Sequence, residues 1–134
     1  MTDPNELADR YVAIWNESDP ERRHATVREL WSDGGMQILQ PPQEIREVAE
    51  TLAMSPILES RGHAELEARV ARAHEEFAAK YEFRRSGRAD RLQDVVTFRW
   101  EAILRDSGEP DGGGRHVFML DPDGRIRLDY LFVD

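Results

Sequence analysis

The segment VVTFRWEAIL, residues 95–104, decides the fold of this chain. Every even-numbered position from 96 to 104 is apolar, while the odd-numbered Thr97, Arg99 and Glu101 are polar. A period of two is typical of a β-strand that turns one face to the core and the other to solvent. The segment therefore predicts a long strand whose even-numbered face packs against another layer of the protein.

The C-terminal part of the chain predicts a β-hairpin. Residues 116–120 and 126–133 are expected to be strands, because the tight-turn sequence DPDG at 121–124 joins them. Shorter strands are expected at 36–40 and 81–84. The alternation in the last strand predicts one buried face made of Ile126, Leu128, Tyr130 and Phe132.

Helix signals fill the first half of the sequence. Asp3-Pro4 and Asp19-Pro20 each place a capping side chain before a proline at the first helical position. Apolar residues at helical spacing follow both signals, and they recur over 45–52 and 66–77, where the charged residues are assigned to a solvated outer face. Helices first and strands last predict an α+β fold, in which a curved antiparallel sheet packs on the N-terminal helices.

Length and composition limit the class of protein. The 134 residues fit one domain, spanning 1–134. With 18 basic and 27 acidic residues the net charge is −9, which argues against binding to nucleic acid or to an anionic membrane. The absence of cysteine excludes disulfides and thiolate chemistry. Neither a secretory signal nor a membrane-spanning run is recognised, so a cytoplasmic location is expected.

Several motifs in one order resemble the snoaL-like polyketide cyclases of the nuclear transport factor 2-like superfamily. They are YVAIWNESDP at 11–20 with LWSDG at 30–34, GHAEL at 62–66, DVVTFRWE at 94–101, and LDPDGRI at 120–126 with DYLF at 129–132. The resemblance implies a cone-shaped α+β barrel, often dimeric through the outer face of its sheet, whose interior binds a small hydrophobic molecule. Relatives include cofactor-independent isomerases, cyclases and epoxide hydrolases as well as proteins without catalysis.

The chain departs from this family at the positions that usually react. Gln40-Pro41 stands where many relatives have an acid before a proline, and Leu92-Gln93 stands where many have a histidine. Arg115-His116 replaces an acid at the start of the next strand. The segment 43–60 is also longer than in typical members, which predicts an added lid or helix. These substitutions leave open whether the protein is an enzyme.

His116 is the leading candidate for a catalytic base. It shares a predicted strand face with Phe118, and an imidazole can take up a proton near neutral pH. Asp94 has the same parity as Val96 and is the second catalytic candidate. The alternatives are a structural histidine at a sheet edge or dimer surface, and a strand-end aspartate that bonds a turn.

The other candidates are expected to line a cavity. Gln40 and Gln93 can orient a ligand carbonyl, and His74 lies at the edge of a buried helix face. The aromatic candidates, most of them expected to be ordinary core, are Trp15, Phe98, Trp100, Phe118 and Tyr130. No metal site is predicted, since no two histidines have the spacing i, i+4, and no cofactor is expected.

The sequence thus predicts a protein that binds a small hydrophobic or aromatic molecule in a cone-shaped cavity. If it is catalytic, the expected reactions are cofactor-independent isomerisation, cyclisation or epoxide hydrolysis. The alternative is a non-catalytic, dimeric interaction protein that uses the outer face of the sheet. In both cases a homodimer is expected.

Overall fold

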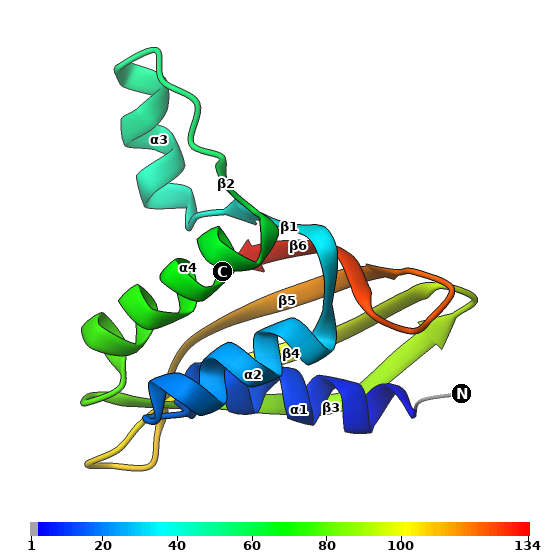
Figure 1. Ribbon diagram of the computed structural model, residues 1–134. Helices are drawn as coiled ribbons and strands as arrows, with labels where there is room; N and C mark the ends of the chain where they lie inside the picture. The colour runs from blue at the N-terminus through cyan, green and yellow to red at the C-terminus, as the bar shows by residue number, and fades with distance from the viewer. Residues whose placement is uncertain (1–2) are drawn as a thin grey trace.

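One six-stranded sheet organises residues 3–134, the part of the chain that the computed structural model describes. Its strand order is β2-β1-β6-β5-β4-β3, and Figure 1 shows it curving around the helices. The strands are β1 (Trp31–Gln40), β2 (Leu58–Arg61), β3 (Tyr81–Leu92), β4 (Val95–Leu104), β5 (Pro110–Leu120) and β6 (Ile126–Val133). The predicted α+β fold, with helices packed on a curved sheet, is confirmed.

The first two of the four helices in residues 3–134 begin where the capping signals predict. The helices are α1 (Pro4–Asn16), α2 (Pro20–Leu30), α3 (Gln43–Thr51) and α4 (Gly62–Phe77). The Asp3 carboxylate accepts a hydrogen bond from the backbone N–H of Asn5 at 3.0 Å, and Asp19 accepts one from Glu21 at 3.0 Å. Each cap satisfies a backbone donor that the first turn of a helix leaves unpaired.

One strand pair differs from the expected antiparallel sheet. β1 runs parallel to β6, whereas the other neighbouring strands are antiparallel. The chain leaves β1 through α3, β2 and α4, crosses to the far edge of the sheet at β3, and returns strand by strand to β6. β1 and β6 therefore become neighbours through distant parts of the sequence, which no local pattern records.

β5 begins before the strand predicted at 116–120 and includes a run of glycines. Gly113 and Gly114 pair with Glu101 and Trp100 of β4. A Cβ on Gly114 would lie 2.1 Å from the Phe132 carbonyl oxygen and 2.9 Å from the Trp100 ring. The absence of a side chain thus allows three strands to approach closely at this point.

A register shift in β6 overturns the predicted buried face of that strand. Ile126 pairs with Leu120, but the pairing shifts by one residue before Leu128 meets Met119. Such a β-bulge exchanges the two faces of the strand beyond it. Asp129 and Leu131 consequently face the core, while Tyr130 lies on the outer face of the sheet.

The core lies between the concave face of the sheet and helices α1 and α4. Tyr11 is at its centre, and the Tyr11 ring meets the rings of His116 and Phe118 edge-on, with centroids 4.8 Å apart in both cases. Trp31 and Phe98 complete this aromatic group and are almost fully buried. The core therefore holds a histidine among its aromatic side chains.

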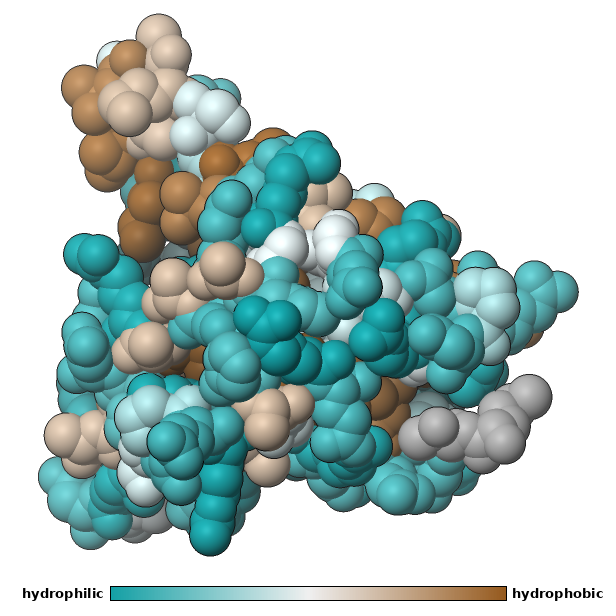
Figure 2. Space-filling view, in the orientation of Figure 1, coloured by the Kyte–Doolittle hydropathy of each residue, from teal (hydrophilic) through white to brown (hydrophobic). Residues whose placement is uncertain are grey.

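The segment 42–58, here called the α3 arm, projects away from the rest of the molecule (Figure 1). It confirms the helix expected at 45–52, but no residue of α3 is buried. Figure 2 shows apolar surface gathered on this projection. Its exposed large apolar residues are Ile45, Val48, Leu52, Met54, Ile57 and Leu58.

None of the helices in residues 3–134 combines the length and apolar character needed to cross a membrane.

Candidate functional site

A buried carboxylate lies at the centre of the candidate site. The bulge in β6 turns Asp129 inward, and its exposed fraction is 0%. Asp129 Oδ1 lies 2.7 Å from His116 Nδ1, while Oδ2 accepts hydrogen bonds from the Tyr11 hydroxyl and from Gln37 Nε2 at 3.0 Å. α1, β1, β5 and β6 each contribute one side chain, so the fold brings together residues far apart in the sequence. Three partners compensate the carboxylate for the hydration it loses on burial.

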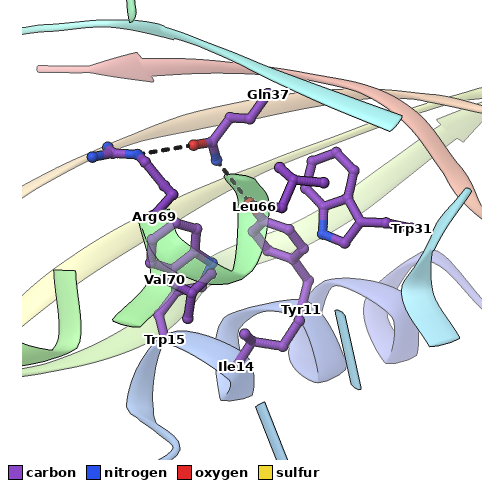
Figure 3. A pocket seen from close by; sticks show the side chains of 8 residues that line it. All are labelled: Tyr11, Ile14, Trp15, Trp31, Gln37, Leu66, Arg69 and Val70. Atoms are coloured by element: carbon purple, nitrogen blue, oxygen red, sulfur yellow. Dashed lines mark hydrogen bonds between the residues drawn. The ribbon is translucent and has the colours of Figure 1, made fainter. Parts of the chain in front are cut away.

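The Gln37 amide links this group to a cation. Arg69 Nε on α4 donates to Gln37 Oε1 at 3.2 Å, and Gln37 Nε2 donates to the Tyr11 hydroxyl oxygen at 3.0 Å (Figure 3). A guanidinium can only donate hydrogen bonds, so its contact fixes which end of the amide faces Tyr11 and Asp129. The result is a continuous polar network from Arg69 to Asp129.

Tyr11 serves this network as a hydrogen-bond donor. Burial, and next the charge of Asp129, raise the pKa of Tyr11 well above its ordinary value of 10.0. The phenol therefore keeps its proton at physiological pH and donates it to the carboxylate.

His116 reaches the network from β5. Its ring stacks on Phe98, with centroids 5.1 Å apart and an angle of 23° between the planes. Because Asp129 holds Nδ1, a neutral His116 carries its proton on that atom and leaves Nε2 as the proton-accepting nitrogen. This arrangement is suited to general acid–base chemistry.

A narrow crevice lies beside the network and is lined by Tyr11, Gln37, Arg69, Trp15, Trp31 and three aliphatic residues. The volume not occupied by atoms is about 210 Å³, and this value includes the solvent at the mouth of the crevice. No part of the crevice is wide enough for a water molecule. Small-molecule sites usually enclose about 300–1,000 Å³. The structure is thus closed where an open chamber was expected, and His116 and Asp129 are not among the residues that line the crevice.

Four of the five predicted aromatic residues fall into three places. Phe98 and Phe118 are buried and pack against His116. Trp15 lines the crevice, whereas the half-buried Trp100 packs edge-on against Phe83 and has its ring centroid 6.2 Å from that of His116. The structure therefore brings His116 together with three predicted aromatic residues.

Two predicted polar residues lie away from the site, at the turn between β3 and β4. Asp94 is exposed, and its backbone carbonyl accepts a hydrogen bond from Leu120 N at 2.7 Å. Gln93 is also exposed and has a left-handed backbone with φ of 54°. The assignment of Asp94 to the inner face was wrong, because β4 begins only at Val95 and its alternation does not extend into the turn.

Three further candidates are misplaced. Gln40 and Tyr130 lie on the outer face of the sheet, where Gln40 pairs with Phe132. Half-buried His74 follows Ala73, which takes the core-facing position on α4, and His74 does not line the crevice. The inward glutamine of β1 is Gln37, three residues before the one predicted.

Four residues of the network were not predicted as site residues. Asp129 was noted only as part of a family motif, and the bulge that turns it inward depends on strand pairing. Tyr11 was grouped with the core, and Arg69 with the solvated face of its helix. A detectable signal existed for Gln37, because it lies two residues before Leu39 and therefore on the same, buried face of the strand.

Solved structures share this fold over the whole chain. A protein from Agrobacterium tumefaciens, named as a suspected isomerase of the snoaL-like family, is 27% identical, covers 96% of this chain and 95% of its own, and superposes with a TM-score of 0.78. This chain resembles that snoaL-like protein in fold and in sequence.

More distant structures agree with that assignment at the level of the fold. A snoaL-like protein of unknown function from Burkholderia thailandensis is 16% identical, with 100% of this chain and 98% of that chain covered and a TM-score of 0.61. A nuclear transport factor 2-like protein from Exiguobacterium is 18% identical, with 96% and 98% covered and a TM-score of 0.60. The sequence matches no protein-family model. A comparison with curated proteins also finds no match.

Proposed function

We propose that this snoaL-like protein binds a small apolar or aromatic molecule in the crevice beside Tyr11 and catalyses a cofactor-independent proton transfer on it. The observation that carries the proposal is the buried Asp129 carboxylate, held by His116, Tyr11 and Gln37 within an aromatic core. Apolar residues of similar size would fill this space without the desolvation cost of an ion. A fully satisfied acid–base group in such a place supports a chemical role.

The geometry supports an isomerisation. In the proposed reaction His116 Nε2 removes a proton from a carbon that lies between a ligand carbonyl and a C=C double bond, and the electron pair of the broken C–H bond moves to the carbonyl oxygen as a dienolate. Tyr11, which lines the crevice, turns its hydroxyl from Asp129 to that oxygen. His116 then returns the proton to another carbon, while Asp129 balances the positive charge on the imidazolium in between.

The closed crevice adds a conformational step to this proposal. Trp15 and Arg69 line the crevice, whereas the His116–Asp129 pair does not line it and is joined to it by the hydrogen bonds of Asp129 with Tyr11 and Gln37. A ligand therefore enters only when side chains along the crevice move apart. The likeness to a relative named for isomerase activity, at 27% identity, supports the proposed class of reaction.

Hydrogen exchange provides a test that does not require knowledge of the natural substrate. The α-protons of 2-tetralone are followed by proton NMR in deuterated water, with wild-type protein and with His116→Gln and Asp129→Asn. We expect exchange above the buffer rate in the wild type, and a loss of about 100-fold or more of that acceleration in His116→Gln, since positioned acid–base groups supply about 10²- to 10⁴-fold. His74→Gln is the control and should exchange as the wild type does. Exchange no faster than buffer in the wild type contradicts the catalytic proposal.

We also propose a homodimer, because several apolar side chains lie together on the outer face of the sheet. Cross-strand neighbours on β1, β6 and β5 place half-buried apolar side chains side by side there. They are Met36, Ile38, Val117, Met119, Leu128 and Tyr130. A contiguous apolar surface of this kind favours association with another protein surface.

Light scattering coupled to size-exclusion chromatography tests the dimer. Tyr130→Glu should halve the molar mass, whereas Arg91→Glu, at the edge of the sheet, should not. A wild-type monomer refutes the proposal. A stable dimer that neither binds aromatic probes nor exchanges 2-tetralone protons would favour the non-catalytic, interaction-protein alternative.

A further inference from the structure

The crevice contains one cation, and its charge has no ion-pair partner within residues 3–134. Arg69 uses Nε to hold Gln37, but neither of its Nη atoms makes a hydrogen bond or ion pair with a described residue. Arg72, three residues further along the same helix, lies 3.4 Å from the Glu76 carboxylate. Arg23, Arg46 and Arg91 are also half-buried without a carboxylate contact, but each donates to a backbone carbonyl oxygen and none lines the crevice. Arg69 differs from them because it is a crevice residue.

The environment of Arg69 favours an anion. Burial disfavours its charged form and lowers its pKa from the ordinary value, an effect that the nearby Tyr11, Glu76 and Asp129 oppose. A guanidinium nevertheless stays protonated in proteins. Its free Nη fork matches the two oxygens of a carboxylate, which it can bind through two parallel hydrogen bonds.

The rest of the crevice describes the other end of the ligand. Besides the polar Arg69, Gln37 and Tyr11, the wall of the crevice consists of Trp15, Trp31 and aliphatic side chains (Figure 3). Gln37 bonds both Arg69 and Tyr11. A ligand anion bound by Arg69 and a ligand oxygen bound by Tyr11 would therefore lie on opposite sides of the Gln37 amide. A ligand that satisfies both ends has an apolar body, a carbonyl and a separate anionic group.

We propose that the ligand of this crevice carries a carboxylate, which the Nη atoms of Arg69 bind while its apolar body lies along Trp15. The inference rests on the proposed function and specifies its substrate class as an aromatic or alicyclic carboxylic acid. Arg69 is then a specificity-determining residue, and Gln37, held by Nε, couples the bound anion to the position of Tyr11.

Two probes with the same body and different charge test this inference. The binding of 2-naphthoate and of 2-naphthamide is measured by quenching of tryptophan fluorescence and by calorimetry. In the wild type we expect 2-naphthoate to bind at least about tenfold more tightly, as hydrogen bonds between charged groups imply. In Arg69→Gln this preference should vanish while the affinity for 2-naphthamide stays within about twofold. Arg72→Gln is the matched control and should keep the preference.

The outcomes separate this inference from the function on which it rests. Equal affinity of the wild type for both probes, or a preference that persists in Arg69→Gln, overturns the anionic subsite and leaves an apolar site intact. If Arg69→Gln loses affinity for both probes to the same extent, Arg69 only positions Gln37, and the anionic subsite is again overturned. Failure of both probes to bind the wild type overturns the subsite together with the proposed aromatic ligand. If Arg69→Gln does not fold, Arg69→Lys takes its place, because lysine keeps the positive charge but lacks the two Nη donors. It should show a smaller preference for 2-naphthoate over 2-naphthamide than the wild type.

Discussion

Replacement of Tyr11 by phenylalanine tests the buried network directly, because it removes one hydroxyl and leaves the ring packing in place. The hydroxyl donates to a fully buried carboxylate and accepts from Gln37. A hydrogen bond to a charged group contributes about 1.5–3 kcal/mol, so we expect Tyr11→Phe to lower the free energy of unfolding by about 2 kcal/mol. At about 2.1 cal/mol/K per residue, 134 residues give an unfolding entropy of about 0.28 kcal/mol/K and a fall in Tm of about 7 °C.

The assay is thermal and urea unfolding of four proteins: the wild type, Tyr11→Phe, Asp129→Asn and the double variant. If the hydroxyl acts mainly on the carboxylate, Tyr11→Phe should cost only about 1 kcal/mol in the Asp129→Asn background, because a neutral acceptor forms a weaker bond. Tyr81→Phe is the matched control, since Tyr81 donates to Asp111 at the surface and should change stability by less than about 0.5 kcal/mol. A cost for Tyr11→Phe no larger than that of Tyr81→Phe, or the same cost in both backgrounds, refutes the described network.

Further predictions concern pH, close packing and burial. Because folding raises the pKa of Tyr11, the contribution of its hydroxyl to stability is complete below about pH 10 and decreases above that pH. The difference in unfolding free energy between wild type and Tyr11→Phe, measured by urea unfolding, should therefore fall by up to about 1.4 kcal/mol per pH unit above about pH 10. Gly114→Ala should cost about 3 kcal/mol or more, since its Cβ would lie 2.1 Å from a backbone oxygen of β6. Gly87→Ala, where the space is open and φ is +73°, should cost about 1–2 kcal/mol, and comparable costs in calorimetry would contradict the packing at Gly114. Ile126→Ala should cost about 2–5 kcal/mol, whereas Leu92→Ala, at a position 77% exposed, should change little; similar losses in urea unfolding would argue against the described core.

The features that the sequence predicted correctly are local ones. Asp3 and Asp19 cap helices through their own backbone neighbours, so the signal and the structure lie within a few residues. The alternation predicted over 95–104 holds in β4 from Val96 to Ala102, but a register shift against β5 ends it there, so that Ile103 is buried as well. A capping bond or a strand period needs no knowledge of the rest of the chain. The single-domain organisation and the cytoplasmic location stay predictions.

The candidate site was only partly predictable, because its geometry depends on pairing between distant strands. His116 was chosen from its own strand, where the parity with Phe118 holds. The inward position of Asp129 depends on a bulge opposite Met119 and Leu120, which a reading of β6 alone does not detect. Arg69 was indistinguishable from the surface charges of α4 until β1 placed Gln37 within hydrogen-bonding distance.

The bulge in β6 makes the proposed chemistry sensitive to the length of one strand. Arg127 is the extra residue of the bulge, so its deletion would leave Ile126 opposite Leu120 and Leu128 opposite Met119 in a regular ladder, with Asp129 still facing inward. An apolar residue inserted directly after Leu128 would instead move Asp129 to the outer face and take its inner position, while the interior stayed hydrophobic. One added codon is therefore a physical route from the proposed enzyme to a pure binding protein with the same scaffold.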